Sequence, residues 1–371
     1  MMNLSYWEIK SWLNNIDFAI IGSGIVGLCC ALSLRKKFPE AKIVVFEKGV
    51  TPQGASTKNA GFACFGSPSE IIEDLKTHSE DEVLSLIKKR IDGLNQLKEL
   101  VGVKNIGYKN YGGYEIFQKK DLSIFENCSS QINYINKLLF PLFNSSVFAI
   151  NKNHFDFQNI TKNFFFNSFE GQIDIGTMME SLIREVYSKK IKILNSVDIL
   201  SFTENNNNVE INSKELDFKC SKLFIATNGF ANKLLKEDIK PARAQVLITN
   251  PIVGLKIKGT FHLDKGYYYF RNIDNRILLG GGRNLDFKNE ETDSFGLNSK
   301  IQTRLDSLLK NVILPKNAFT VDKRWSGIMG VGDKKIPVIK TISENVFCGV
   351  RLGGMGIAIG ASVGDELANK I

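Results

Sequence analysis

The chain has 371 residues, of which 43% are hydrophobic and 23% charged, close to the averages of soluble globular proteins. Its length exceeds that of a small module and indicates one large or two intimate domains, and its composition excludes a mostly disordered or membrane-embedded chain. The net charge of +9 comes from basic residues dispersed among acidic ones. Solvated lysine-rich faces therefore account for it better than nucleic-acid binding, although an acidic ligand stays open.

Cysteine and histidine usage limits the chemistry further. The six cysteines include no CxxC pair, which predicts reduced, mostly buried thiols in a cytoplasmic protein. None of His78, His154 and His262 lies three to five residues from another His or Cys, as compact zinc sites require. The sequence therefore predicts no metal site.

Two apolar stretches could be mistaken for membrane segments. Residues 18–34 are interrupted by three glycines and preceded directly by Asp17, and residues 346–363 carry Arg351 and five glycines. A charged residue and many glycines make a poor lipid-exposed helix. We therefore expect both stretches to be parts of a soluble fold.

In chain order, the first elements are a strand, a glycine turn, a helix and a second strand. DFAIIG is a buried-strand pattern, GSGIVG follows it, an apolar helix is expected to about Lys37, and KIVVFE is the next strand. Residues 51–68 have loop composition, and apolar spacing predicts a helix over 80–101. The unit resembles one crossover between parallel strands.

The later elements suggest a second domain inserted into the first. Aromatic strands such as GGYEIF and a helix over 121–140 follow a composition shift near Gly102. A helix from 173, strands such as KIKILN, SVDILSF and KLFIATNG, and a hairpin tip at 205–208 come next. Strands dominate 244–283, a helix is expected over 298–311, and a strand, glycine loop and helix end the chain.

The glycine turn is the most informative motif. Gly22, Gly24 and Gly27 form GxGxxG between a strand and a helix, where they permit a tight turn, backbone approach to a pyrophosphate, and close helix–strand packing. Glu47 lies 20 residues beyond Gly27, where a carboxylate can accept hydrogen bonds from a ribose. These features predict dinucleotide binding and argue against a 2′-phosphorylated ribose, but they do not separate FAD from NAD.

Several further segments occur in an order that identifies a family resemblance. GSGIVG with Glu47, GASTKNAGF at 54–62, IDIGTMMESL at 173–182, ATNG at 226–229 and RLGGMGIAIG at 351–360 span nearly the whole chain. Together they resemble the FAD-dependent amine and amino-acid oxidoreductases of the D-amino-acid oxidase superfamily, which includes glycine oxidase, sarcosine oxidase and D-amino-acid dehydrogenase. The resemblance implies an α/β fold in which parallel and mixed sheets occur together (α+β mixed).

The resemblance also implies how the chain divides. We expect a Rossmann-like FAD-binding domain from 1–103, 168–242 and 325–371, and an inserted mixed-sheet substrate domain from 104–167 and 243–324. It implies the following cofactor-binding residues: Gly22, Ser23, Gly24, Ile25, Gly27, Glu47, Lys48, Ser56, Thr57, Lys58, Asn59, Ala60, Gly61, Val197, Ala226, Thr227, Gly229, Arg351, Gly353, Gly354, Met355, Gly356 and Ile357. An exposed loop at 56–59, an ordinary turn at 226–229 and a packing corner at 353–356 are the structural alternatives. Because 325–335 contains no cysteine, we predict non-covalent FAD.

The substrate side departs from the family pattern. Relatives commonly hold the substrate carboxylate with an arginine in the strand before the final glycine loop, because a guanidinium matches a carboxylate bidentately. Met329 stands at that position here. Arg271 with Tyr269 is a candidate substitute, against the alternative of a surface sheet residue. Lys58 could stabilise reduced flavin or be simply solvated.

The resulting hypothesis is an FAD-dependent oxidoreductase that oxidises a C–N bond of a small amine or amino-acid-like substrate by hydride transfer to flavin. Oxygen or another acceptor would reoxidise the cofactor. The alternatives are a flavoprotein that modifies a tRNA base or amino group and a non-catalytic FAD-binding protein. The sequence shows no basic cluster that favours the first alternative, whereas Met329 fits the second.

Overall fold

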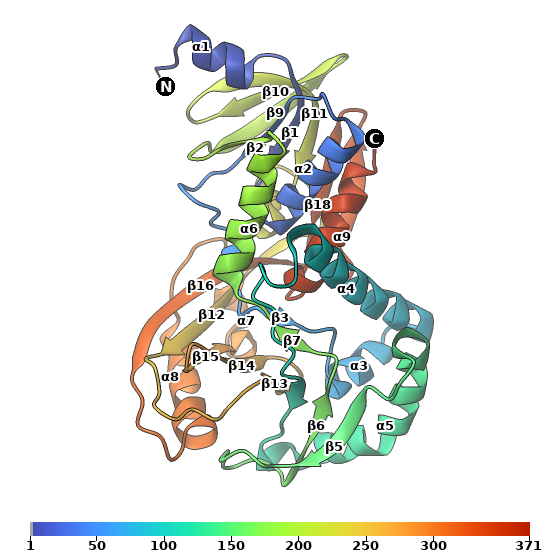
Figure 1. The fold of residues 1–371 in the computed structure, drawn as a ribbon, viewed down its shortest axis with the longest axis vertical. Helices are drawn as coiled ribbons and strands as arrows, with labels where there is room; N and C mark the ends of the chain where they lie inside the picture. The colour runs from blue at the N-terminus through green and yellow to red at the C-terminus, as the bar shows by residue number, and fades with distance from the viewer. Residues whose placement is uncertain (1–2) are drawn as a thin grey trace.

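A parallel sheet forms the core of the upper half of the molecule, as oriented in Figure 1. The computed structural model describes residues 3–371. Five strands lie parallel in the order β8 (Lys192–Leu194), β2 (Ile43–Phe46), β1 (Ile16–Ile21), β11 (Asp217–Ile225) and β18 (Val346–Val350). The antiparallel strand β17 (Val338–Ser343) adds an edge, and β9 (Ile199–Asn205) and β10 (Asn208–Ser213) extend β11. The carboxyl ends of β1, β2 and β11 therefore meet at one edge, where open α/β sheets bind ligands.

Both faces of this sheet are covered. Helices α2 (Ile25–Lys37) and α9 (Gly356–Ala368) pack against each other and on one face (Figure 1). The two helices approach so closely that a Cβ at Gly364 would lie 2.6 Å from the carbonyl oxygen of Val26. On the other face, the Phe46 and Phe218 rings stack at 4.2 Å. Burial on both faces explains the continuous apolar runs of these strands.

A mixed sheet forms the core of the other half (Figure 1). Its order is β16 (Val321–Val331), β12 (Lys240–Thr249), β15 (Arg276–Gly281), β14 (Tyr268–Ile273), β13 (Thr260–Leu263), β4 (Gly113–Glu115), β6 (Asn163–Asn167) and β5 (Phe148–Lys152). One face, with Phe261 and Phe270 stacked at 4.5 Å, packs on α8 (Ser299–Leu308). Because side chains alternate along strands, the opposite face carries Val246, His262 and Tyr269 toward the first half.

The remaining elements connect the halves. Helix α4 (Glu80–Val101) packs against α9 and also contacts α3 (Pro68–Leu75) and α5 (Leu122–Phe143), while α6 (Ile175–Ser188) contacts α2. The two-residue strands β3 (Phe62–Ala63) and β7 (Gly171–Gln172) pair with each other. Short helices are α1 (Tyr6–Glu8) and α7 (Phe287–Glu290).

Two features of the structure bear on how the chain divides into domains. Strands β12 and β16 pair with each other from Lys240 to Thr249 and from Val321 to Val331, so they run across the expected boundaries at 242/243 and 324/325. Residues of α3 and the first half of α4 share a core with α5. We propose an FAD-binding region and a substrate-binding region that share continuous strands rather than two separable domains.

Most predicted elements are confirmed. The helix expected over 80–101 has those limits, the helix after the glycine turn ends at Lys37, and Asn205 and Asn208 flank the tip of the β9–β10 hairpin. The segment expected to be a loop at 51–68 contains a 3₁₀ turn at Ala55–Thr57 and strand β3. A two-residue strand is too short to show periodicity, so it carries no sequence signal.

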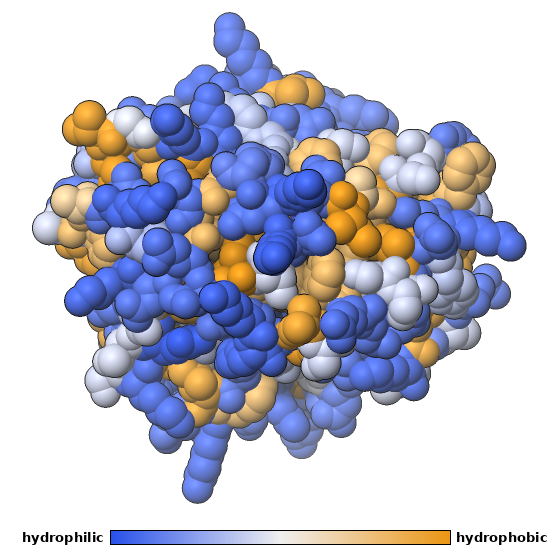
Figure 2. Space-filling view, turned by 90° about the horizontal axis from the view of Figure 1, so that it is seen from below, coloured by the Kyte–Doolittle hydropathy of each residue, from blue (hydrophilic) through white to orange (hydrophobic). Residues whose placement is uncertain are grey.

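The surface agrees with an ordinary globular protein. Seen from below, the half that contains the mixed sheet is mostly hydrophilic, with hydrophobic side chains in small separate groups (Figure 2). Within residues 3–371, no helix combines the length and the apolar character needed to cross a membrane.

Candidate cofactor and substrate cavity

A large cavity lies between the carboxyl edge of the parallel sheet and the mixed sheet. Its volume is about 1160 Å³, compared with about 300–1,000 Å³ for typical small-molecule sites. Its walls come from the glycine turn, the loop at 54–61, the end of β11, strand β16 and the loop at 351–356, and also from β12, β13 and β14. The cavity therefore reaches from the predicted cofactor motifs to the mixed sheet.

The glycine turn has the geometry that its motif predicts. Gly22 has a φ of 105°, and a Cβ at Gly27 would lie 1.9 Å from the Gly22 carbonyl oxygen. Helix α2 begins directly after Gly24 without a side-chain cap of its own. Instead, the Ile25 amide donates to Ser56 Oγ at 3.0 Å. The helix N-terminus and its positive end therefore lie at the cavity wall, where they favour an anion.

Glu47 is fixed beside this turn. Its Oε2 accepts hydrogen bonds from the amide and the hydroxyl of Ser23 at 3.1 and 2.7 Å, and its Oε1 accepts from the Gly49 amide at 3.0 Å. The side chain lines the cavity, although the residue is only 7% exposed. A carboxylate held in this way can accept hydrogen bonds from ribose hydroxyls without reorganising.

The loop at 54–61 is held by its own side chains. Asn59 donates to the carbonyls of Ala55 and Ser56 and accepts from the Gly61 amide, and Thr57 donates to the carbonyl of Pro52. Lys58 lines the cavity, and its carbonyl accepts a hydrogen bond from Trp325 Nε1 at 2.9 Å. The expected polar loop is therefore an ordered wall of the cavity.

The end of β11 contributes a turn that approaches β16 closely. A Cβ at Gly229 would lie 2.5 Å from the Met329 carbonyl oxygen, so Gly229 supports packing and does not line the cavity. Thr227 lines it, and its buried Oγ1 has no hydrogen-bond partner in the described chain. Asn228 was not predicted as a site residue, yet it lines the cavity and accepts from the Leu352 amide at 3.1 Å. Its position within the ATNG motif is the sequence feature that could have identified it as a site residue.

The final glycine loop leads into α9. Arg351 has a φ of 63° and donates to Asp238 Oδ2 at 2.8 Å and to the Ile336 carbonyl, which fixes the shape of the loop. Around Gly353 and Gly354 there is open space where a Cβ would stand. Helix α9 begins at Gly356 without a side-chain cap, so its amides are available at the cavity wall.

Most predicted cofactor residues line one cavity. These are Gly22, Gly24, Ile25, Glu47, Lys48, Ser56, Lys58, Asn59, Ala60, Gly61, Val197, Ala226, Thr227, Arg351, Gly353, Gly354, Met355, Gly356 and Ile357. Ser23, Gly27, Thr57 and Gly229 support them from behind. The fixed carboxylate, the glycine cradle, the uncapped helix ends and the unpartnered Thr227 hydroxyl fit FAD.

On the substrate side, Tyr269 and Met329 line the cavity, but Arg271 does not. Arg271 is 2% exposed and donates to the carbonyls of Gly61 and Ile173 at 3.2 and 2.7 Å. Burial lowers the pKa of Arg271 to about 10 and raises that of Tyr269 to about 12. Arg271 therefore fastens the 54–61 loop to the segment before α6, and it is neither a surface residue nor placed to hold a substrate.

Other charged residues reach the cavity that sequence reasoning missed. Arg283, just after β15, is partly buried with its guanidinium 4.8 Å from the centre of the Phe287 ring. Among residues 3–371 it has no ion-pair or side-chain hydrogen-bond partner. Its only sequence signal was a basic residue directly after the glycines of RILLGGGR.

His262 lies beside Tyr269 across the β13–β14 pair and also lines the cavity. Its Nε2 is 3.4 Å from Glu170 Oε2. Burial disfavours the charged imidazole, but Glu170, helped by Glu70 and Glu115, outweighs burial and raises the pKa of His262 to about 9. No sequence pattern joins these residues, because they come from distant segments.

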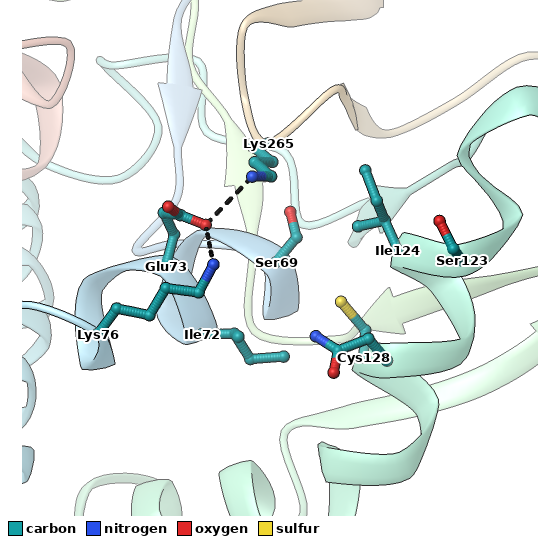
Figure 3. Close-up of a pocket in the computed structure, with 9 residues that line it drawn as sticks. Ser69, Ile72, Glu73, Lys76, Ser123, Ile124, Cys128 and Lys265 are labelled. Carbon is teal, nitrogen blue, oxygen red and sulfur yellow. Dashed lines mark hydrogen bonds and ion pairs between the residues drawn. The ribbon is translucent and has the colours of Figure 1, made fainter.

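A smaller recess of about 170 Å³ adjoins the cavity between α3 and α5 (Figure 3). Glu73 and Lys265 line both spaces. Glu73 accepts from Lys76 at 2.9 Å and from Lys265 at 3.1 Å, so these charges are paired. Cys128 of α5 lies in this recess, away from the cavity.

Comparison with known proteins places the fold and the family. The structure is similar to L-proline dehydrogenase from P. horikoshii (TM-score 0.74, 17% identity, covering 96% of this chain and 92% of that one). It is also similar to glycine oxidase from Geobacillus kaustophilus (TM-score 0.74, 16% identity, covering 95% and 94%). No curated protein matches the sequence. The DAO family, described as FAD dependent oxidoreductase, matches residues 17–370. The chain therefore belongs to the DAO family of FAD-dependent oxidoreductases.

Proposed function

We propose that this protein oxidises a C–N bond of a small amine or amino-acid-like substrate with non-covalently bound FAD. The observation that carries the proposal is the continuity of one cavity from Glu47 and the glycine turn to Tyr269 and Met329. Such a cavity can hold a dinucleotide and a small molecule side by side. The absence of cysteine from 325–335 supports non-covalent binding.

When bound, FAD would supply the acceptor for the hydrogen and electron pair of the carbon next to nitrogen, and water would hydrolyse the imine product. The chain must hold the substrate and complement charge. The amides at the start of α9 and the ammonium of Lys58 favour negative charge at the cofactor end of the cavity. The phenol of Tyr269 stays neutral at physiological pH and can donate a hydrogen bond.

The side chains at the substrate end of the cavity indicate which charge a substrate would carry. Met329 offers no charge where relatives commonly carry an arginine, whereas the Arg283 guanidinium lines the cavity without an ionic partner within residues 3–371. Guanidinium groups bind carboxylates bidentately. Arg283 therefore supports a substrate with an acidic group, which it would bind in place of Arg271.

The test uses the purified protein. We expect a flavin absorbance spectrum, release of FAD on denaturation, and anaerobic bleaching with some members of a panel of amines and amino acids. Reoxidation by air or only by an added acceptor then separates an oxidase from a dehydrogenase. A colourless protein that does not bind added FAD would refute the proposal. Retained FAD without bleaching by any amine would instead favour a non-catalytic FAD-binding protein.

A further inference from the structure

Three potential metal ligands meet at the substrate wall of the cavity. Cys64 follows β3, Glu170 precedes β7, and His262 lies in β13. The pairing of β3 with β7 brings the first two together, and the mixed sheet supplies the third. All three residues are buried, and one ligand atom from each lies within 4.8 Å of the other two. We propose that Cys64, Glu170 and His262 bind a zinc ion.

The geometry of the His262–Glu170 pair supports this proposal. The two atoms are 3.4 Å apart, yet His262 Nε2 is buried without a hydrogen-bond partner in the described part of the chain. Tetrahedral zinc with nitrogen and oxygen ligands at about 2.0–2.1 Å separates them by about 3.3–3.4 Å. Unsatisfied buried polar atoms are costly and rare, and zinc bound in place of the imidazole proton would give Nε2 a direct partner.

The thiol needs only a small adjustment. Zinc–sulfur bonds of about 2.3 Å place the sulfur about 3.6 Å from the other two ligands. Cys64 Sγ lies within 4.8 Å of both, so it would have to approach each of them by at most about 1.2 Å to reach these separations. The Phe65 amide lies 3.4 Å from Glu170 Oε1, which orients the carboxylate as partners behind metal ligands do.

Charge also favours a divalent cation at this position. A zinc-bound thiolate and the Glu170 carboxylate together balance the two charges of the ion, since bound cysteine is deprotonated. With a neutral imidazole as the third ligand, a divalent cation would leave no net charge in the buried site.

The site would be open on one side. Cys64 and His262 line the cavity, whereas Glu170 lies behind them. Three protein ligands with an open fourth position are typical of zinc sites that bind water or substrate. We infer that the fourth position faces the cavity and accepts a water or an oxygen donor of a bound molecule. This inference rests on the cavity wall and not on the amine chemistry proposed above.

Metal content of the FAD-loaded protein tests the site. The protein is equilibrated with zinc, dialysed to remove weakly bound ions, and measured by elemental analysis. We expect about one zinc per chain, and at least about tenfold weaker zinc binding in Cys64→Ser and in His262→Ala. Cys128→Ser, in the separate recess of Figure 3, and His154→Ala, an exposed histidine, are matched controls that should keep the metal.

X-ray absorption at the zinc edge gives a second test that needs no variant. The expected result is one sulfur at about 2.3 Å and nitrogen or oxygen at about 2.0–2.1 Å. Substoichiometric zinc in the wild type, a zinc shell without sulfur, or unchanged binding in both variants would overturn the proposal. These measurements do not require turnover, so they can be made without knowing the substrate of the enzyme. The flavin spectrum reports whether each variant is folded.

Discussion

The hydroxyl of Ser23 in the glycine turn donates to the carboxylate of Glu47 at the end of β2, at 2.7 Å. These residues are 24 positions apart in the chain, yet the parallel register of β1 with β2, in which Ile21 pairs with Phe46, brings them together. The hydrogen bond holds the carboxylate at the place where a ribose is expected. Glu47 therefore combines a fixed position with unused acceptor capacity.

Replacing Glu47 tests this role. We expect Glu47→Ala to weaken FAD binding about tenfold to a hundredfold, because hydrogen bonds to a charged group are worth about 1.5–3 kcal/mol. Titration of the FAD-free protein, followed by flavin fluorescence, gives the affinity. Glu40→Gln, at an exposed position, should bind FAD like the wild type. Equal affinity of the Glu47 variant would exclude the ribose contact.

Two glycines offer a matched pair of substitutions. A Cβ at Gly27 would meet the Gly22 carbonyl oxygen at 1.9 Å, whereas a Cβ at Gly354 would meet nothing within 4 Å. Gly27→Ala should therefore lower the free energy of unfolding by about 2 kcal/mol or more and weaken FAD binding. Gly354→Ala should leave stability unchanged, as measured by urea unfolding. Similar stability of both variants would contradict the close helix–strand contact.

Arg271 should matter for stability. Arg271→Met leaves the buried carbonyls of Gly61 and Ile173 without their donor, which should cost on the order of 2 kcal/mol. Urea unfolding measures the loss. Once folded, the variant should keep the wild-type KM for its substrate, since Arg271 does not line the cavity. A raised KM with full stability would return Arg271 to the role of carboxylate clamp.

Arg283 should show the opposite behaviour. Arg283→Gln removes a cavity cation that has no ionic partner among residues 3–371, so KM for acidic substrates should rise about tenfold or more through the loss of a charged hydrogen bond. The KM for neutral amines and the unfolding midpoint should stay unchanged. Steady-state kinetics with matched acidic and neutral substrates decides this, with the exposed Arg184→Gln as control.

Glu115 should make stability depend on pH. Burial raises its pKa from 4.5 to about 7, although Ser69 donates to it. The folded state therefore favours the protonated form, and stability is full below pH 4.5 and falls as pH rises toward 7. The fall for this group is on the order of 3 kcal/mol by linkage. Urea unfolding at several pH values measures this loss of stability. The loss should be absent in Glu115→Gln and present in Glu126→Gln, which changes an exposed residue. An identical pH profile for wild type and Glu115→Gln would contradict the raised pKa.

The glycine turn and Glu47, which we predict to bind the cofactor, can be recognised from the sequence alone. Gly22, Gly24, Gly27 and Glu47 sit within one crossover unit, where local turn geometry and parallel pairing leave few alternatives. The limits of α4 and the tip of the β9–β10 hairpin are also predicted correctly from the sequence, because apolar spacing and a run of asparagines are local signals.

The surroundings of Arg271, Tyr269 and Met329, in contrast, depend on how distant segments pack together. Alternation along β14 places Arg271 and Tyr269 on one face, but it cannot reveal that Arg271 meets the carbonyl of Gly61, 210 positions away. The same holds for Arg283 at the cavity and for the meeting of Cys64, Glu170 and His262. Periodicity specifies the direction of a side chain within its own element. Its partner depends on how distant elements pack, and burial then decides whether its charge binds a ligand or holds the protein together.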